Sequence, residues 1–453
     1  DYVGGVAGYN YGTITSCYSN VVVTGATPVG GVVGNNHGTI TNCYNTGSVT
    51  GNGINSSTTE DVGGVVGCNH GTIINCYNTG SVACNGDNHS SKEGGVAGEN
   101  YGTITNCYNK GSIFCNATTE NIYIGGVAGD GHSAGMISNC YNTGSITEHG
   151  YSKYTRQVGG VMGCNFGTLT NCYNAGSVLI NDTDSTIYWY HRGGVVGYYD
   201  SLEKISNCYY CTDVVIGVKG AINDRDTENC KGLTLDQMTG ANALDNMAFT
   251  GDAGTWVTLA NETELDEDKE IDYYSPQLST FVSDPANPQP EEMPTITCYK
   301  SRDGRILPPY PITTAEQLQD MKYSPGGVFI LANDIDMTGI TFTPIGSDKA
   351  PFNGILDGRG YEVQNLTIDN STGDYQGLFG NVGTDGKVKN VGVTGSITAN
   401  DYVGGIAGYN NGNITNCYST ATIIGHENVG GVAGDSAGTI TNCYNTGSVT
   451  SNN

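Results

Sequence analysis

The chain has 453 residues, of which 69 are glycine and 14% are charged. This length exceeds one ordinary globular core, and glycine at twice its usual share of ~7% favours a repeat architecture. The 44 acidic against 18 basic residues give a formal charge of −26, which excludes nucleic acid and anionic membrane surfaces as partners because both repel a polyanion. No apolar run reaches the ~18 residues of a membrane-spanning helix, so we expect no membrane span in this chain.

A repeat built on a Gly-Gly pair dominates the chain. Residues 29–50 read VGGVVGNNHGTITNCYNTGSVT, and residues 429–450 read VGGVAGDSAGTITNCYNTGSVT. The pair begins at Gly4, Gly30, Gly63, Gly94, Gly125, Gly159, Gly193, Gly404 and Gly430. Successive spacings of 26, 33, 31, 31, 34 and 34 residues, and 26 again in the last pair, indicate a 26-residue coil with insertions of 5 to 8 residues.

Each coil carries three short segments with β character, Gly-Gly-Val-Val-Gly, Gly-Thr-Ile-Thr-Asn and Gly-Ser-Val-Thr, which are too short and too rich in glycine for helices. Stacking at roughly 4.8 Å per coil pairs each segment with its copies above and below. Val32, Ile40 and Val49 are expected to face inward. The sequence therefore predicts an all-β fold, a parallel β-solenoid (β-helix) of about nine coils in two blocks, with short helical caps. The insertions are expected as long loops along one edge, the natural recognition face.

The chain order predicts five segments. They are residues 1–213 (a solenoid block of seven coils), 214–282 (an exit cap with a short helix), 283–310 (a Pro-rich acidic linker), 311–345 (an entrance cap with a short helix) and 346–453 (a second solenoid block with two clear coils). The exit helix is expected between Leu235 and Phe249, and the entrance helix begins near Thr314 with a hydroxyl at its N-cap. Caps laid across the open ends of the solenoid would block edge-to-edge aggregation.

Nine of the 16 cysteines occupy one repeat position, each followed by tyrosine and all but one preceded by asparagine. They are Cys17, Cys43, Cys76, Cys107, Cys140, Cys172, Cys208, Cys417 and Cys443. We interpret this column as a structural ladder of Asn amides bonded from coil to coil, small buried thiols and stacked phenol rings on the rim. Disulfides within the column are not expected, because equivalent Cβ atoms lie about 4.8 Å apart, beyond the ~3.5–4.5 Å that a disulfide prefers.

Two further cysteines are candidates for a disulfide. Cys84 and Cys115 each lie 8 residues after a ladder cysteine in adjacent coils, so a disulfide between them fits the spacing. No metal site is predicted, because within a coil the Cys-x-x-Cys spacing occurs only at Cys208 and Cys211, which lack the second half of a zinc motif.

The coils and the segments between them together resemble a known family. The Gly-Gly-Val-Ala-Gly and Gly-Thr-Ile-Thr-Asn-Cys-Tyr strings are similar to the GLUG repeat. Residues 311–400, with ITTAEQLQDM, VFILANDIDM and FNGILDGRGYEVQNLTI, resemble the usual entrance to such a module, and residues 208–282, with LTLDQMTGANALDNMAF and GTWVTL, its usual exit. GLUG repeats occur in large bacterial and archaeal surface proteins and adhesins, and in the stalks of immunoglobulin-A-cleaving peptidases. The resemblance implies an extracellular or cell-surface location.

The order of these segments is reversed for a self-contained module, because the exit cap precedes the entrance cap and coils stand at both chain ends. Joining the end to the beginning restores the order: SVTSNN would run into DYVGGVAGYN, and the internal boundary from Ser396 reads SITANDYVGGIAGYN. We therefore expect head-to-tail self-association, in which the coil around Gly430 stacks on the coil around Gly4 of a neighbouring subunit or of the next unit in a longer chain.

Two classes of function stay open. The first is an extracellular structural protein, a subunit or segment of a head-to-tail surface filament, with a monomeric adhesin rod whose loops bind host or surface glycans or proteins as the alternative. The second is a β-helix enzyme acting on polysaccharides, for which Asp334, Asp336, Asp357, Asp182 and Asp184 are the candidate acids. The first three recur in cap motifs and the last two form an ordinary solvated turn. No enzyme activity is predicted, and no catalytic or cofactor-binding residue is assigned.

Other chemical signatures are weak. The chain has no His-Glu-x-x-His string, so the peptidase chemistry of some GLUG proteins is not expected. Calcium stays open as a stiffener through the acidic runs at 223–226 and 265–270, although neither has the spacing of a twelve-residue calcium loop. No other cofactor is expected.

Overall fold

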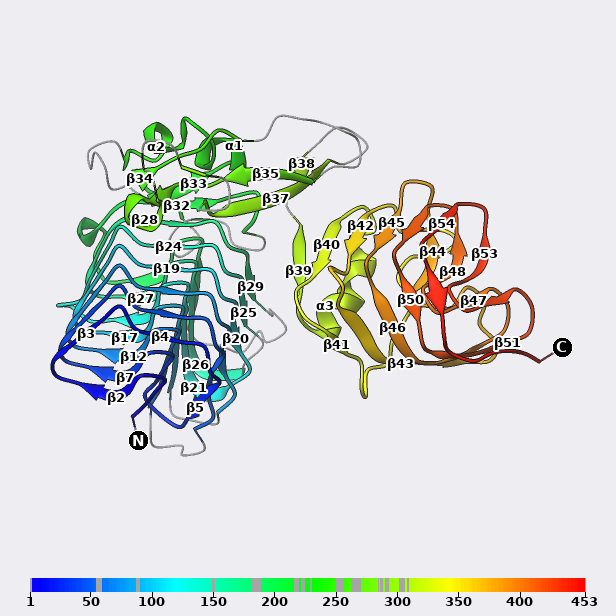
Figure 1. Cartoon of the computed structure of the whole chain (residues 1–453), viewed down its shortest axis with the longest axis horizontal. Helices are drawn as coiled ribbons and strands as arrows, with labels where there is room; N and C mark the ends of the chain where they lie inside the picture. The colour runs from blue at the N-terminus through cyan, green and yellow to red at the C-terminus, as the bar shows by residue number, and fades with distance from the viewer. Residues whose placement is uncertain are drawn as a thin grey trace. The chain divides into compact units, whose positions relative to one another are not determined.

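The computed structural model describes residues 2–452 with the exception of 54–58, 87–89, 149–150, 181–188, 216–219, 221–224, 229, 250–255, 262–269, 284, 286–287, 290–292, 301–305 and 308. The chain forms two compact units, residues 1–264 with 272–296 and residues 265–271 with 297–453. In each unit the coils stack as ribbons along parallel sheets (Figure 1). The predicted all-β parallel solenoid is confirmed.

The first unit has seven stacked coils, whose Gly-Gly segments form one parallel sheet. Its strands are β1 (Val3–Gly4), β6 (Val29–Gly30), β11 (Thr59–Gly63), β16 (Ser90–Gly94), β21 (Thr118–Gly125), β26 (Tyr151–Gly159) and β30 (Trp189–Gly193). The next turn of each coil forms a second sheet. Its strands are β2 (Ala7–Asn10), β7 (Val33–Asn36), β12 (Val66–Asn69), β17 (Ala97–Asn100), β22 (Ala128–Gly131), β27 (Met162–Asn165) and β31 (Val196–Tyr199).

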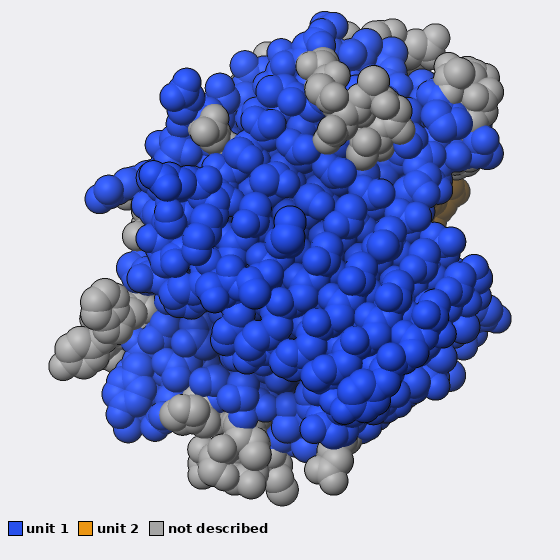
Figure 2. All heavy atoms as spheres, turned by 90° about the vertical axis from the view of Figure 1, so that its left-hand side faces the viewer, with its two compact units in different colours: residues 1–264, 272–296 blue, residues 265–271, 297–453 orange. Residues whose placement is uncertain are grey.

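Two more sheets close each coil. The Thr-Ile-Thr and Tyr-Asn segments share one sheet, made of β3 (Thr13–Thr15), β8 (Thr39–Thr41), β13 (Thr72–Ile74), β18 (Thr103–Thr105), β23 (Met136–Ser138), β28 (Thr168–Asn174), β24 (Tyr141–Asn142), β19 (Tyr108–Asn109), β14 (Tyr77–Asn78), β9 (Tyr44–Asn45) and β4 (Tyr18–Ser19), with β32 (Ile205–Cys211) and β33 (Cys230–Leu233) added at β28. The last sheet holds β5 (Val23–Gly25), β10 (Val49–Gly51), β15 (Val82–Cys84), β20 (Ile113–Cys115), β25 (Ile146–Glu148) and β29 (Val178–Ile180). Figure 2 shows one face of this unit, on which side chains of successive coils form regular rows.

After β31 the chain also forms short elements. They are η1 (Leu202–Lys204), α1 (Leu235–Met238), α2 (Ala243–Asn246), β34 (Trp256–Val257), β35 (Glu270–Tyr274), β36 (Gln277–Leu278), η3 (Ser279–Phe281), β37 (Thr295–Lys300) and β38 (Ile306–Leu307). The helical pattern that we expected between Leu235 and Phe249 is two four-residue helices instead of one. Gly240 separates them with a φ of +76°, a left-handed conformation that glycine adopts without steric cost and that ends a helix.

The second unit repeats the architecture with its own entrance. Its elements are β39 (Tyr310–Ile312), α3 (Ala315–Asp320), η5 (Met321–Tyr323), β40 (Val328–Leu331), β41 (Ile335–Asp336), β42 (Ile355–Asp357), β43 (Glu362–Asn370), β44 (Phe379–Val382), β45 (Lys387–Lys389), β46 (Gly392–Ala399), β47 (Val403–Gly404), β48 (Ala407–Asn410), β49 (Asn413–Thr415), β50 (Tyr418–Ser419), β51 (Thr422–Gly425), β52 (Val429–Gly430), β53 (Ala433–Ser436), β54 (Thr439–Thr441), β55 (Tyr444–Asn445) and β56 (Val449–Ser451). Thr314 caps α3 as expected: its hydroxyl accepts from Gln317 N, and Gln317 reaches back in a capping box.

The insertions differ from the expectation of loops. In β11, β16 and β21 the inserted residues extend the strands and pair in parallel register, with Thr59 opposite Ser90 and Ser90 opposite Asn121. Insertions of nearly equal length in successive coils allow this pairing, since each inserted backbone meets a neighbour of the same conformation. The described part of this edge is therefore an extension of the Gly-Gly sheet.

The core is a set of vertical columns of identical or similar residues. Val32, Ile40 and Val49 are fully buried, as predicted, and each lies in a column of Val or Ile from neighbouring coils. The glycine pair is required by close packing: a Cβ on Gly95 would lie 2.2 Å from Asn109 Cγ and 2.3 Å from Gly126 O. Glycine at this position lets one coil approach the next across a buried asparagine.

A ladder of buried asparagines holds successive coils at this close distance. Asn109 Nδ2 donates to Asn142 Oδ1 at 2.8 Å and to Gly111 O at 2.8 Å, while its Oδ1 accepts from Asn78 Nδ2 at 2.9 Å and from Gly111 N at 3.2 Å. The same bonds link Asn45, Asn78, Asn109, Asn142 and Asn174. We did not single out this asparagine, which follows six of the nine Cys-Tyr pairs, although its repetition in Asn-Thr-Gly was a usable signal.

Replacing Asn109 by alanine should therefore destabilise the solenoid by about 3–5 kcal/mol, since the amide of Asn78 and both backbone groups of Gly111 lose buried partners. Asn106→Gly is the matched control, because Asn106 has a φ of +54° that glycine accepts, and its side-chain bond with Asn139 is only partly buried. Thermal unfolding followed by circular dichroism should show a large loss of midpoint for Asn109→Ala and a small one for Asn106→Gly. Equal losses would contradict the ladder.

A buried carboxyl makes stability depend on pH. Glu93 is fully buried and accepts a hydrogen bond from Ser91, and Glu60, Cys84 and Cys115 face it from adjacent coils. Burial raises the pKa of Glu93 to about 7, above its usual 4.5. Because the folded state holds this proton more tightly than the unfolded chain does, protonation of Glu93 contributes to the stability of the fold. This contribution is fully present below the usual pKa of 4.5 and is lost as the pH rises through about 7, the pKa in the folded protein.

Glu93→Gln should remove this dependence. The variant is expected to match the wild type near pH 4.5 and to be more stable above pH 7 by on the order of 3 kcal/mol, the free energy of a shift of that size. Thermal midpoints of both proteins between pH 4.5 and pH 8 provide the measurement. A difference between them that does not change with pH would show that Glu93 is not the titrating group.

Candidate functional site

The cysteine column lines the interior of both solenoids. Cys107 Sγ accepts from Cys76 N at 3.4 Å and donates to Thr105 O at 3.2 Å, and this pattern recurs along the column. Seven of the nine ladder cysteines are fully buried, whereas Cys17 and Cys443, in the first and last coils, are half-buried. Burial raises the pKa of the Cys76 and Cys107 thiols, which stay neutral at physiological pH.

The Cys84–Cys115 disulfide that we considered is not present. Both residues are free and buried, although β15 and β20 place them directly opposite each other. Parallel pairing keeps the Cβ atoms of equivalent residues about 4.8 Å apart, the spacing between coils. This distance exceeds the ~3.5–4.5 Å between the Cβ atoms of a disulfide. Cys84 Sγ is instead 3.0 Å from Glu60 Oε2 and 2.8 Å from Ser91 Oγ.

The tyrosine column stacks along the rim and is partly covered by the exit segment. Tyr44, Tyr77 and Tyr108 stack with centroids 4.8 Å apart. Further along, Tyr141 OH donates to Gln277 Oε1 at 2.8 Å and Tyr173 OH to Pro276 O at 2.6 Å. The exit segment thus packs on the side of the solenoid, over the tyrosines, which we did not anticipate.

The acids of the entrance segment form structural turns. Asp334 Oδ1 accepts from Glu362 N at 2.9 Å, and Asp336 Oδ1 accepts from Asn365 Nδ2 at 2.9 Å and from Thr338. Asp357 is buried and accepts from Asn390 Nδ2 at 3.0 Å, with Lys389 Nζ at 3.2 Å.

These bonds determine how the entrance acids titrate. Hydrogen bonds from Asn365 and Thr338 lower the pKa of Asp336. Burial opposes ionisation of Asp357, yet its bonds with Asn390, Arg359 and Lys389 lower its pKa as well. A general acid at neutral pH needs a raised pKa, so neither carboxyl is suited to that role.

Several candidates lie outside the described residues. These are Asp182 and Asp184, residues 223–224 of one acidic run and 265–269 of the other. Of the described acids in those runs, Asp226 accepts a hydrogen bond from Gly232 N at 3.3 Å.

The first and last coils expose what the inner coils bury. In the last coil Ile440 and Val449 are 40% and 42% exposed, whereas Ile414, the partner of Ile440 one coil earlier, is fully buried. In the first coil Val6 is 41% exposed and Tyr11 77%. Each of these coils has a solenoid partner on one side only among the described residues.

The free backbone groups of the two coils are complementary. Inside the second unit, Ile406 N and Ala407 N donate to Val432 O at 2.9 and 3.1 Å. By the same pattern Val432 N and Ala433 N of the last coil point to a following coil, and Val6 of the first coil occupies the acceptor position.

The first coil also has backbone donors, and these point towards a preceding coil. His37 N and Gly38 N donate to Asn10 O at 2.8 and 3.1 Å, so Tyr11 N and Gly12 N of the first coil point to a preceding coil. Ser436 of the last coil occupies the acceptor position there, because it is the register partner of Asn410 and so corresponds to Asn10. Each open edge therefore offers the donors and acceptors that the other requires.

Comparison with known proteins supports the resemblance seen in the sequence. The GLUG motif matches residues 25–50, 58–83 and 399–424. A protein of Evansella cellulosilytica named as a Gly-rich membrane protein is 36% identical over 122 residues, which cover 24% of this chain and 14% of that protein. Halomucin of Haloquadratum walsbyi is 28% identical over 217 residues, 44% of this chain and 2% of its own length. The chain thus spans a small part of each relative.

Two other findings complete the comparison. No solved structure matches the chain. Among the described residues, no helix is long and apolar enough to cross a membrane.

Thiol labelling checks the placement of the cysteine column. A short pulse of iodoacetamide on the native protein should modify Cys17 and Cys443 first and leave Cys43, Cys76 and Cys107 unmodified, as located by peptide mass spectrometry. Hydrogen bonding from Cys417 lowers the pKa of Cys443 to about 6, which favours its reactive thiolate. Modification of Cys107 at the rate found in denaturant would mean that the column is not buried.

Proposed function

We propose that this chain is a structural segment of an extracellular surface fibre, in which solenoid coils stack head to tail. The coil around Gly430 stacks on the coil around Gly4 of another copy, or of the next unit of a longer chain. The observation that carries the proposal is the complementarity of the two open coils, in both their backbone groups and their exposed side chains. Unpaired strand edges are templates for pairing with another strand of matching register.

The side chains at the seam match as well as the backbone. Extending the internal register places Ile440 on Ile14, Tyr444 on Tyr18 and Val449 on Val23. These pairs continue the Ile, Tyr and Val columns of the interior. Such an interface is heterologous, so it does not close on itself and propagates as a filament.

The comparisons support a role at the cell surface. The GLUG motif recurs along the chain, and one relative is named as a membrane protein and another as a halomucin. The acidic composition is compatible with a hydrated exterior, since a high net charge keeps a protein soluble.

A monomeric adhesin rod is the second candidate. In the second unit an open hollow of about 500 Å³ is lined by Asp357, Arg359, Gly360, Asn390, Asn416 and Tyr418. Carboxylate, amide, guanidinium and phenol groups together suit a hydroxyl-rich ligand such as a glycan. An enzymatic role is not favoured, because the carboxylates of the entrance segment hold turns, and hydrogen bonds lower the pKa of Asp336 and of Asp357.

Ile440→Asp tests the fibre. The side chain lies on the open edge, so a charge there has little effect on the single chain, but stacking would bury it against Ile14. The wild type should form filaments visible by negative-stain microscopy and sediment as large species, and Ile440→Asp should remain monomeric with an unchanged circular dichroism spectrum. Thr439→Asp, an exposed neighbour on the same strand, adds the same charge and should still assemble.

A wild type that stays monomeric at high concentration would contradict assembly between separate copies. If that monomer also binds glycans, the adhesin rod takes its place. Filaments of Ile440→Asp with the wild-type appearance would show that the chains associate through another surface.

A further inference from the structure

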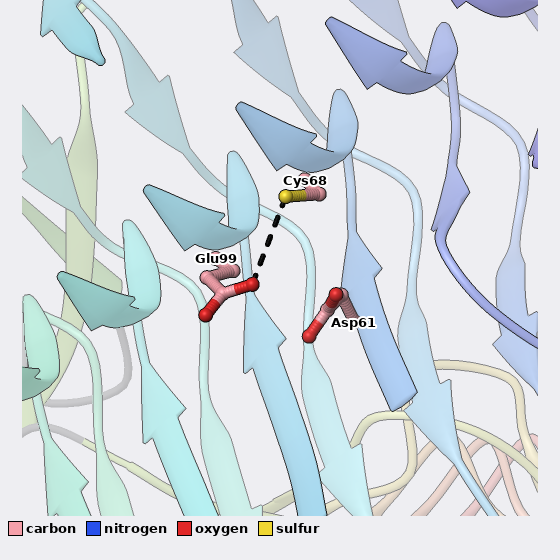
Figure 3. A group of neighbouring side chains, drawn as sticks. All are labelled: Asp61, Cys68 and Glu99. Carbon is pink, nitrogen blue, oxygen red and sulfur yellow. Dashed lines mark hydrogen bonds between the residues drawn. The ribbon is translucent and has the colours of Figure 1, made fainter. Parts of the chain in front are cut away.

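A polar cluster lies in the third and fourth coils, beside the Gly-Gly sheet. Asp61 is in β11, Cys68 in β12 and Glu99 in β17 (Figure 3). Cys68 and Glu99 are register partners in adjacent coils, and Asp61 comes from the neighbouring sheet. Figure 3 shows the two carboxylates and the thiol directed towards one another.

The donor atoms of the cluster converge. One donor atom each from Asp61, Cys68 and Glu99 lies within 4.8 Å of the others. Cys68 Sγ is 3.7 Å from Glu99 Oε2 and 3.4 Å from His70 Nε2. His70 is exposed at the turn after β12, near Cys68 but outside the group of three converging donors, and offers a nitrogen donor on the solvent side.

One carboxylate oxygen of the cluster has no hydrogen-bond partner among the described residues. Asp61 is 7% exposed, and its Oδ1 is buried without a hydrogen bond. Glu99 is divided between two roles: its Oε1 contacts Lys92, Tyr101 and His132, while its Oε2 faces Cys68. A buried oxygen without a partner is costly, and Asp61 belongs to the group of side chains whose donor atoms converge.

The cluster also contains more carboxyl groups than ammonium groups. Asp61, Glu99 and Asp130 are buried carboxyls, and Lys92 is the ammonium between them, in contact with Glu99 and 3.1 Å from Asp130. The carboxyl groups of the cluster thus outnumber its ammonium, and a divalent cation would add positive charge among them.

We propose that Asp61, Cys68, His70 and Glu99 form a binding site for a divalent transition-metal ion of the zinc type. One sulfur, one nitrogen and two oxygen donors match the ligands and the fourfold coordination of Zn²⁺. The thiol disfavours Ca²⁺ and Mg²⁺, which take oxygen ligands. Exposed His70 provides the path of entry, and Lys92 holds the second oxygen of Glu99 as an outer partner.

A second set of donors in the same region is less suited to a metal. Glu99, Asp130 and His132 also lie within 4.8 Å of one another. There Lys92 already contacts both carboxylates, so a metal ion would have to displace an ammonium. The proposed site is a structural one: it would link the coil of Cys68 to the coil of Glu99 through side chains.

Cobalt provides the direct test, because thiolate coordination of Co²⁺ gives a charge-transfer absorption in the near ultraviolet. The whole chain, stripped with a chelator, is titrated with Co²⁺ under reducing conditions. We expect this absorption to saturate near one equivalent and to disappear when Zn²⁺ is added. Cys68→Ser should abolish it, and Asp61→Asn should weaken Zn²⁺ binding at least about tenfold, the smaller effect seen when partners of a metal site are lost.

Cys164→Ser is the matched control. Cys164 belongs to the same column three coils further on, where its register partner is Asp130, and it is as buried as Cys68. This variant should keep the full absorption. Circular dichroism verifies that all variants are folded. A wild type without the absorption, or a folded Cys68→Ser that retains it, would overturn the proposal.

Discussion

The structure depends on one constraint: every coil must lie in parallel register on the next. Register places Val on Val, Ile on Ile and Cys on Cys, and it brings the buried asparagines within hydrogen-bond distance of one another. Each column follows from that register, because a shift by one residue would turn every side chain to the opposite face. The glycine pair, the asparagine ladder and the cysteine column are three ways in which the sequence satisfies the same close approach between coils.

Most of the fold could be predicted from the sequence, because residues that recur at a regular spacing show which positions of successive coils pair with one another. The nine Gly-Gly pairs and the Asn-Cys-Tyr column led to the solenoid and to inward Val32 and Ile40. The hydroxyl of Thr314 before a helical pattern led to the capped start of α3. The insertions were harder, since their sequences differ from coil to coil and carry no column signal. Their pairing as strands depends on similar lengths in neighbouring coils, a property of the array that no single insertion displays.

The polar cluster around Asp61 could not be predicted from the repeat in this way. Its members come from different repeat positions and from two coils, and Cys68 replaces an Asn or Tyr found elsewhere in its column. Such residues look like variation at a surface position until the fold brings them together. A useful signal was present all the same: Cys68, Glu99 and Asp130 occupy one repeat position in three successive coils, which concentrates donors on one face.

The same constraint gives the proposed fibre its physical basis, because a coil that stacks on its neighbour inside the chain can stack equally well on a coil of the same kind outside it. Hydrogen exchange of the backbone amides in the first and last coils tests this most directly. On going from dispersed to assembled protein, the amides of Val432, Ala433, Tyr11 and Gly12 should gain protection, while those of inner coils stay unchanged. If the end-coil amides exchange equally fast in both preparations, the coils do not continue across the seam and the account fails.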